Sequence, residues 1–298
     1  MEYRIYLGPS HTNCDHLRAL IEKNQDLLRA EKIHCVPPEK SNDIWDKIRT
    51  AHKEDADRKQ MHATFLKHCL EGVDPENVEQ LVFWFPTIKE RIVDVVRAGD
   101  LLPRIRFITR VFTAFLPNDQ LVFTSAVRNP AKFIVAIYSK NLKRGNKDSF
   151  DVFLDDKRPD QMEWSNTWER FLIPFGKLHP DDAPLYLWRN EDYPSNWRSV
   201  LSVITGHQDP DLFQPIEQPL QQDMSLYGAA LMHHYLTEKN VSDKAEREVI
   251  FEKFLKDYPD DGTIIKSNTW TLELLTQIKQ SYSDDWYFLE QMDHVITL

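Results

Sequence analysis

Short apolar runs alternate along the chain with longer stretches in which apolar residues repeat near the helical period. The runs cover residues 3–7, 33–36, 81–85, 120–127 and 185–189. Continuous apolar character over about four to eight residues is typical of strands that are covered on both faces. We therefore predict five strands. Pro37 and Pro38 end the second one, because proline cannot extend a ladder of hydrogen bonds.

The stretches between these runs predict helices. Their apolar spacing indicates helix in residues 15–32, 42–71, 88–98, 103–115, 130–138, 164–175, 197–204 and 223–280. Residues 208–222 are rich in Pro, Gln and Asp, show no period, and predict a long connection. The chain ends in a strand-like HVITL. Strands that alternate with helices predict parallel pairing through right-handed crossovers, which is an α/β fold.

The composition limits the kinds of partner that the protein can bind and the cellular compartment in which we expect it. The chain has 37 Lys and Arg against 47 Asp and Glu, a net charge of −10. This acidic excess excludes binding to a nucleic-acid backbone, and no apolar run approaches the roughly 18 residues of a membrane span. The three cysteines form no C-x-x-C pair, and the start MEYRIYLG lacks a signal peptide. We therefore expect a soluble cytoplasmic protein without disulfides.

The turn between the first strand and its helix is the expected place for a ligand. In an open parallel sheet, ligands bind beyond the carboxyl ends of the strands, where helix N–H groups attract phosphates. Here that turn is GPSHTNCDHL, residues 8–17. It offers Gly8, Ser10 and Thr12, but it has one glycine and no lysine, so it does not meet the P-loop motif.

Several segments carry a resemblance that spans most of the chain. YRIYLGPSHTNCDHLRALIEKNQDLLRAEKIHCVPP, SAVRNPAKFIVAIYSKNLKRG and DSFDVFLDD follow one another in order, and LYLWRNEDY, LSVITG and SYSDDWYFLEQMDHVITL come later. Together they resemble the bacterial sulfotransferase family. The resemblance implies a three-layer α/β/α P-loop-kinase-like fold, with a mostly parallel five-stranded sheet and extra C-terminal helices. Residues 1–298 would form a single domain, with 208–298 as its helical C-terminal extension.

The resemblance also implies an activity. Members of the family transfer a sulfuryl group from 3′-phosphoadenosine 5′-phosphosulfate to a hydroxyl or amine acceptor and require no metal. The implied donor-binding residues are Gly8, Ser10, His11, Thr12, Asn13, Cys14 and Arg128. The implied acceptor is a small molecule or a carbohydrate.

The chain departs from the family pattern at the turn. The family's lysine falls on His11, which makes His11 the candidate catalytic residue, and Thr12 matches. The following glycine falls on Asn13, and the two hydroxyl positions fall on Cys14 and Asp15. A carboxylate that faced the phosphosulfate here would repel it strongly.

Two later positions also decide what the chain can do. Arg128 is retained where the family contacts the 3′-phosphate, but the partner serine falls on Ala136. The family's base falls near residues 84–86, which hold no titratable side chain. Two hypotheses follow: an active or formerly active sulfotransferase, or a catalytically impaired relative, a pseudoenzyme that serves as a binding or interaction module.

Single residues allow more than one interpretation. His11 is a replacement cation, a general acid or base, or an ordinary turn histidine. Asp15 is the N-cap of the helix if it does not face the ligand. Arg128 is an anion contact or half of a structural ion pair.

Other candidates have a simpler explanation. A metal site of His11, Cys14, Asp15 and His16 is disfavoured, because residues so close in sequence do not all aim at one point. Basic side chains after the fourth strand are typical of a solvated helix face: Lys140, Lys143 and Arg144. Two groups of histidines lack the spacing expected of metal ligands. One group is His52, His62 and His68, and the other is His233 and His234. The tryptophans line an acceptor pocket or, more commonly, the core: Trp164, Trp168, Trp188, Trp197 and Trp270.

Overall fold

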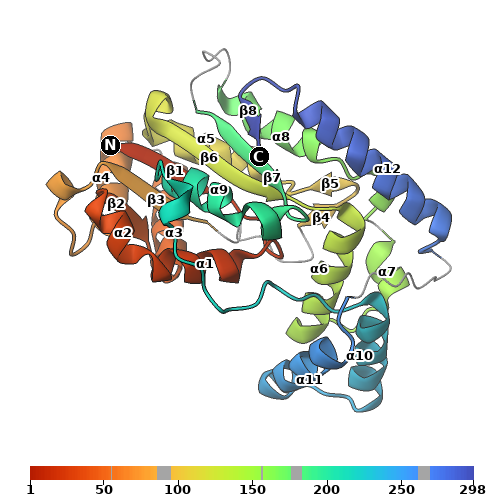
Figure 1. The fold of residues 1–298 in the computed structure, drawn as a ribbon. Helices are drawn as coiled ribbons and strands as arrows, with labels where there is room; N and C mark the ends of the chain where they lie inside the picture. The colour runs from red at the N-terminus through yellow and green to blue at the C-terminus, as the bar shows by residue number, and fades with distance from the viewer. Residues whose placement is uncertain (55, 86–94, 156, 176–182, 261–268) are drawn as a thin grey trace.

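Six parallel strands form one sheet in the computed structural model, which describes residues 1–298 except 55, 86–94, 156, 176–182 and 261–268 (Figure 1). The strands are β1 (Glu2–Tyr6), β2 (Ile33–Val36), β3 (Gln80–Trp84), β6 (Leu121–Val127), β7 (Leu185–Arg189) and β8 (Val295–Thr297). Their order across the sheet is β2-β3-β1-β6-β7-β8. The prediction of an α/β fold with parallel pairing is confirmed.

The expected number of five strands is wrong. The strand-like C-terminal run pairs with β7, in the register Leu185 to Val295, and becomes the sixth strand. The sequence did not reveal this pairing because β8 is short and half-exposed, so it lacks the continuous apolar run of the inner strands. By contrast, all seven residues of β6 are buried, as expected for a strand at the sheet centre.

Helices cover both faces of the sheet. Tyr6, Trp84 and Trp188 point to one face, where they pack against α1 (Cys14–Lys23), α2 (Gln25–Ala30) and α9 (Tyr193–Thr205). Ile5, Phe83 and Phe123 point to the other face. Side chains that alternate between the two faces are buried on both, and this explains the continuous apolar runs in the sequence.

The helices of the second face and of the C-terminal region complete the fold. They are α3 (Pro38–Lys53), α4 (Arg58–Cys69), α5 (Ile105–Phe115), α6 (Pro130–Arg144), α7 (Phe150–Leu154), α8 (Trp164–Leu172), α10 (Leu226–Glu238), α11 (Lys244–Asp257) and α12 (Leu272–Leu289). Short 3₁₀ turns occur at Pro75–Asn77, Asn118–Gln120, Pro159–Gln161, Ile173–Phe175 and Pro210–Leu212. In Figure 1, α6 extends beyond the sheet and α10 and α11 pack on its far end.

Most predicted helices are present, with corrected boundaries. The stretch 42–71 contains two helices, α3 and α4. Residues 96–97, which we expected in a helix, form strand β4 (Val96–Arg97) of a hairpin with β5 (Asp100–Leu101), and residues 88–94 of that helix lie outside the described residues. The expected helical extension 208–298 contains α10, α11 and α12 and also supplies β8 to the sheet.

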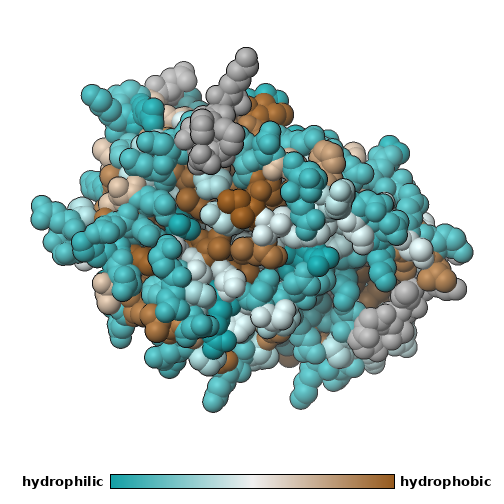
Figure 2. Space-filling model, turned by 45° about the horizontal axis from the view of Figure 1, so that its top comes forward, coloured by the Kyte–Doolittle hydropathy of each residue, from teal (hydrophilic) through white to brown (hydrophobic). Residues whose placement is uncertain are grey.

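The outer surface carries mainly hydrophilic side chains. Figure 2 shows them over most of one face, with hydrophobic residues gathered toward its centre. Large exposed apolar side chains among the described residues include Val152 of α7, Val249 of α11 and the neighbours Tyr287 and Phe288 of α12.

The order of the strands creates a switch point beside β1. From β1 the chain runs to β2 at the sheet edge, returns through β3 to one side of β1, and then crosses to β6 on its other side. The connections after β1 and β6 therefore leave neighbouring strand ends in opposite directions. Such a point opens a crevice outside the carboxyl ends of the strands, which is where open α/β sheets bind ligands.

Candidate functional site

Three loops meet at this switch point, one after each of β1, β6 and β7. Arg128, the first residue after β6, donates from Nη1 to the backbone oxygen of His11 at 2.7 Å. Asn13 donates from Nδ2 to Oδ1 of Asn190, which follows β7, at 2.8 Å. Residues 8–14 with Arg128 and Asn190 are called the switch-point site below. The structure thus brings together all seven residues that the sequence predicted for donor binding.

Strand β6 holds the turn in place. The oxygen of Gly8 accepts hydrogen bonds from Ala126 N at 2.9 Å and from Ser125 Oγ at 2.7 Å. Gly8 itself has a φ of 84°, a backbone conformation that disfavours residues with a Cβ. The single glycine of the turn therefore lies where the backbone needs one.

The turn uses two of its polar side chains internally. Thr12 is fully buried and donates from Oγ1 to the oxygen of Pro9 at 2.6 Å. The thiol of Cys14 donates to the same oxygen at 3.2 Å. Ser10 is half-buried, and its hydroxyl has no hydrogen-bond partner among the described residues. Ser10 is therefore the turn's one free hydroxyl within the described part of the chain.

Helix α1 begins at this site without a side-chain cap. Its N-cap is Asn13, a left-handed residue with a φ of 61° whose side chain makes no capping bond. The interpretation of Asp15 as the N-cap is wrong, because Asp15 lies inside the first turn and is exposed. The first N–H groups of a helix have no carbonyl partner within it, so α1 presents uncapped donors at the turn.

His11 is buried, and its surroundings disfavour the charged form of its imidazole. Its side chain is held by Gln221, whose Nε2 donates to Nδ1 at 2.9 Å, and its own Nε2 has no partner among the described residues. Burial is the main reason that the pKa of His11 lies below its ordinary value; the nearby Asp223 carboxylate opposes this shift, while Lys140 and Arg128 add to it. The imidazole is therefore neutral at pH 7 and does not replace the family's lysine as a cation.

Arg128 is neutralised by a carboxylate from a distant part of the chain. Its Nη2 forms an ion pair with Asp223, which also lies 3.6 Å from Nδ1 of His11. Although burial alone raises the pKa of Asp223, the polar contact with His11 and the positive charge of Arg128 outweigh it and bring the pKa to about 2. The Nε of Arg128 is buried and has no partner among the described residues. Arg128 thus forms a structural ion pair and still keeps one unused donor.

A cavity of about 540 Å³ lies at this point. It is lined by residues of all three loops and by a segment that crosses them: Asn13, Arg128, Lys132, Asn190, Glu191, Pro194, Pro219, Leu220, Gln221, Gln222, Asp223 and Asp260. A cavity at a switch point with a few convergent polar groups is the usual form of a small-molecule site.

The sequence did not reveal four residues of this region. Gln221 and Asp223 come from the aperiodic connection, and Asn190 follows a strand at which no motif pointed. Lys140 was expected on a solvated face, but it is half-buried and close enough to His11 to help lower the pKa of that imidazole. Ala136 is fully buried on α6 and offers no hydroxyl where the family has serine.

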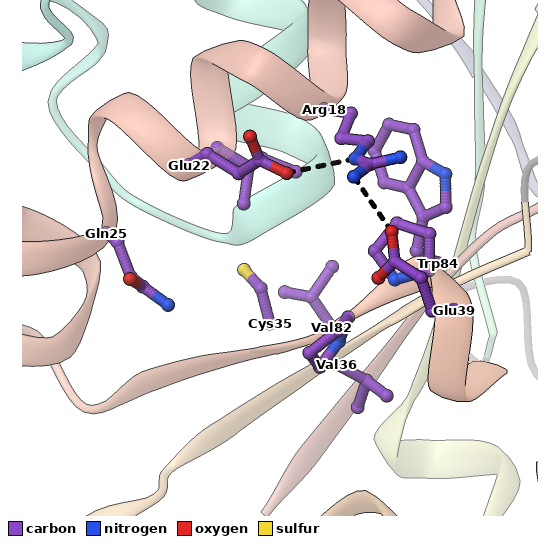
Figure 3. Close-up of a pocket in the computed structure, with 11 residues that line it drawn as sticks. Arg18, Glu22, Gln25, Cys35, Val36, Glu39, Val82 and Trp84 are labelled. Carbon is purple, nitrogen blue, oxygen red and sulfur yellow. Dashed lines mark hydrogen bonds and ion pairs between the residues drawn. The ribbon is translucent and has the colours of Figure 1, made fainter.

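A second cavity, of about 220 Å³, lies between α1 and the start of α3 (Figure 3). Its floor is apolar and includes Val82 and Trp84 of β3. At its rim, Arg18 bridges Glu22 at 2.9 Å and Glu39 at 2.8 Å. The second cavity therefore has carboxylates in the same lining as Trp84, a position at which the sequence showed no titratable group. This cavity shares no lining residue with the switch-point cavity.

The residues considered as metal ligands point apart. His16 bonds through Nδ1 to the hydroxyl of Tyr193 at 2.7 Å, and Asp15 is exposed. Within the described ranges, no three His, Cys, Asp or Glu side chains gather into a metal-binding group. His62 forms a hydrogen bond through Nε2 to the hydroxyl of Tyr3 at 2.8 Å.

The tryptophans that the sequence suggested as core residues are buried, with the exception of Trp197.

Comparisons with known proteins add no relative. The chain matches no protein-family model, no curated protein and no solved structure. In the described part of the chain, no helix combines the length and apolar character that crossing a bilayer requires. The assignment of a function therefore rests on the geometry of the switch-point site.

Proposed function

We propose that the chain is a sulfotransferase-like protein with a P-loop-kinase-like fold, whose switch-point site binds 3′-phosphoadenosine 5′-phosphosulfate. The observation that carries this proposal is the 2.7 Å hydrogen bond from Arg128 to the backbone of His11. It joins the first strand-to-helix turn and the arginine after β6 into one site. These are the two segments in which the resemblance puts the ends of the donor.

The unused donors at the site support an anionic ligand. The buried Nε atoms of Arg128 and His11 have no partner among the described residues, and the start of α1 is uncapped. Buried donors without partners are costly, so a ligand that accepts from them gains affinity. Phosphate and sulfate oxygens accept such bonds well, especially at the start of a helix.

A second candidate, the catalytically impaired relative, is favoured by the charges at the turn. Sulfuryl transfer builds negative charge on the leaving phosphate, and a missing cation there typically costs about 3 kcal/mol of transition-state stabilisation. His11 is neutral, and the positive charge of Arg128 is met by Asp223. We therefore propose that the site binds the donor more readily than it transfers the sulfuryl group. Its acceptor would be a small molecule or a carbohydrate.

The test separates binding from transfer. We expect millimolar adenosine 3′,5′-bisphosphate, the product of sulfuryl donation, to raise the melting temperature, because a ligand that binds only the folded state stabilises it. Consumption of 3′-phosphoadenosine 5′-phosphosulfate with a panel of hydroxyl and amine acceptors should be slow, and His11→Lys should increase it. No thermal shift at all would contradict binding, while fast turnover by the unmodified protein would favour the active enzyme.

A further inference from the structure

A segment of the long connection lies across the switch-point site. Residues 217–223, called the strap here, contact three residues of the site. The backbone N–H of Gln221 donates to Oδ1 of Asn13 at 3.0 Å, and its side-chain amide donates to His11 at 2.9 Å. Asp223 pairs with Arg128. Among the described residues, the hydrogen bonds that join the strap to the turn come from Gln221.

Asp223 gives Arg128 what an anionic ligand would give it. Its carboxylate meets the guanidinium while 14% of its side chain remains exposed, and it lies 3.6 Å from His11. A guanidinium recognises carboxylate and phosphate oxygens by the same planar donor geometry. The carboxylate and a phosphate oxygen therefore compete for one position.

The backbone of the strap is anchored at each end by a hydrogen bond, and between these anchors the bonds to the turn come from Gln221 alone among the described residues. Toward its N-terminal side, Gln214 N donates to Oδ1 of the buried Asn24 at 2.8 Å. At its C-terminal end, the backbone oxygen of Asp223 accepts from Asp260 N at 2.8 Å. Residues 217–220 and 222 are exposed, and Leu220 keeps 38% of its surface accessible. The strap can therefore lift from the turn while both anchors stay in place.

We propose that the strap is an autoinhibitory element, in which Asp223 occupies Arg128 as a built-in anion until a phosphate-bearing ligand displaces it. This inference rests on the proposed function, because it assumes that the switch-point site binds anions. It adds that the free protein holds this site closed. The ligand's apparent affinity is then lowered by the share of molecules that are closed.

The test compares two variants that each remove one negative charge from the strap. Asp223→Asn breaks the pair with Arg128, whereas Glu217→Gln changes an exposed residue for which the structure shows no contact with the turn. By titration calorimetry with adenosine 3′,5′-bisphosphate, we expect Asp223→Asn to bind about tenfold more tightly than the unmodified protein. Glu217→Gln should bind like the unmodified protein. Gln221→Ala, which loosens the strap and keeps Asp223, should tighten binding by a smaller factor.

Hydrogen exchange gives a readout that needs no ligand. The amides of residues 217–223 should exchange faster in Asp223→Asn than in Glu217→Gln. The autoinhibitory role of the strap is wrong if all variants bind the ligand with equal affinity, or if the amides of residues 217–223 exchange equally fast in Asp223→Asn and Glu217→Gln. Either result leaves the proposed function intact. If no variant binds the ligand, the proposed function is wrong. The proposed competition between Asp223 and a phosphate for Arg128 is then wrong as well.

Discussion

At the scale of single residues, the turn after β1 contains polar groups of two kinds. Thr12 and Cys14 bond to the backbone of the turn itself and hold its shape. The Nε atoms of His11 and Arg128 are buried without partners among the described residues, and the hydroxyl of Ser10 is free within them. Folding gains nothing from an unmet donor, so these groups are the ones that a ligand would use.

Thr12 and Ser10 therefore give a matched pair of substitutions. Thr12→Val removes a buried hydroxyl and leaves the oxygen of Pro9 without its 2.6 Å bond, so it should lower the free energy of unfolding by about 1–2 kcal/mol. Ser10→Ala should change it by less than about 0.5 kcal/mol. Urea denaturation measures both values. A similar loss in the two variants would show that Thr12 has no special role in the turn.

His11 predicts a dependence of stability on pH. Burial lowers its pKa below 6.5, so the unfolded chain takes up a proton at a higher pH than the folded protein. His11 therefore makes the free energy of unfolding fall as the pH drops below about 6.5. Asp223, with a pKa of about 2 against an ordinary 3.8, adds a further loss only between about pH 4 and pH 2.

The comparison with His11→Gln isolates this effect from other histidines. Between pH 7 and pH 5, the stability of the unmodified protein should fall more steeply than that of His11→Gln, because glutamine takes up no proton. Thermal unfolding at several pH values measures both slopes. Parallel curves over this range would mean that His11 titrates alike in the folded and unfolded chains.

At the scale of elements, one helix supplies the cap of another. The N-cap of α8, Glu163, makes no capping bond with its side chain. Instead Asp285 of α12 accepts from Trp164 N at 2.6 Å and from Ser165 N at 3.1 Å. Trp164 in turn donates from its indole to the oxygen of Arg128 at 2.7 Å. The C-terminal helix α12 thus fixes α8 and, through it, the backbone of the switch-point site.

This arrangement predicts a large effect of Asp285→Ala. The substitution leaves two buried N–H groups unpaired and should lower the free energy of unfolding by about 2 kcal/mol. Asp284→Ala is the control, since Asp284 is the exposed neighbour on the same helix and bonds only to Gln280 among the contacts shown. Denaturant unfolding distinguishes them. A loss in Asp285→Ala no greater than that in Asp284→Ala would contradict the capping role.

At the scale of the whole molecule, the sequence predicted what depends on local pattern. Continuous apolar runs located the inner strands, and the strand-to-helix turn and Arg128 meet as expected, because parallel strands end at one edge of the sheet. It did not predict the partner of Arg128. Asp223 lies 95 residues away, in a connection without periodicity, and no local rule assigns such a carboxylate to one cation. The pairing of β8 was missed because this strand is short and half-exposed and lacks a continuous apolar run.

The net charge of the molecule makes the ion pair between Arg128 and Asp223 important for ligand binding. With a net charge of −10, the protein as a whole repels anions. Local cations must therefore attract any phosphorylated ligand, and Arg128 is held by Asp223. Lys140 is half-buried near the turn, and the closeness of other cations adds to the burial that lowers its pKa. The state of the strap thus decides whether the switch-point site attracts or repels an anion.

The most direct measurement is the affinity of adenosine 3′,5′-bisphosphate for two variants that both lack the charge of Asp223. One carries Asp223→Asn alone, and the other also carries Arg128→Gln, which keeps a neutral hydrogen-bonding pair. If the turn and Arg128 form one anion site, calorimetry will show binding to the first variant and a loss of at least about tenfold in the second. Equal affinity of two folded variants would contradict the account, because the anion would then bind without Arg128.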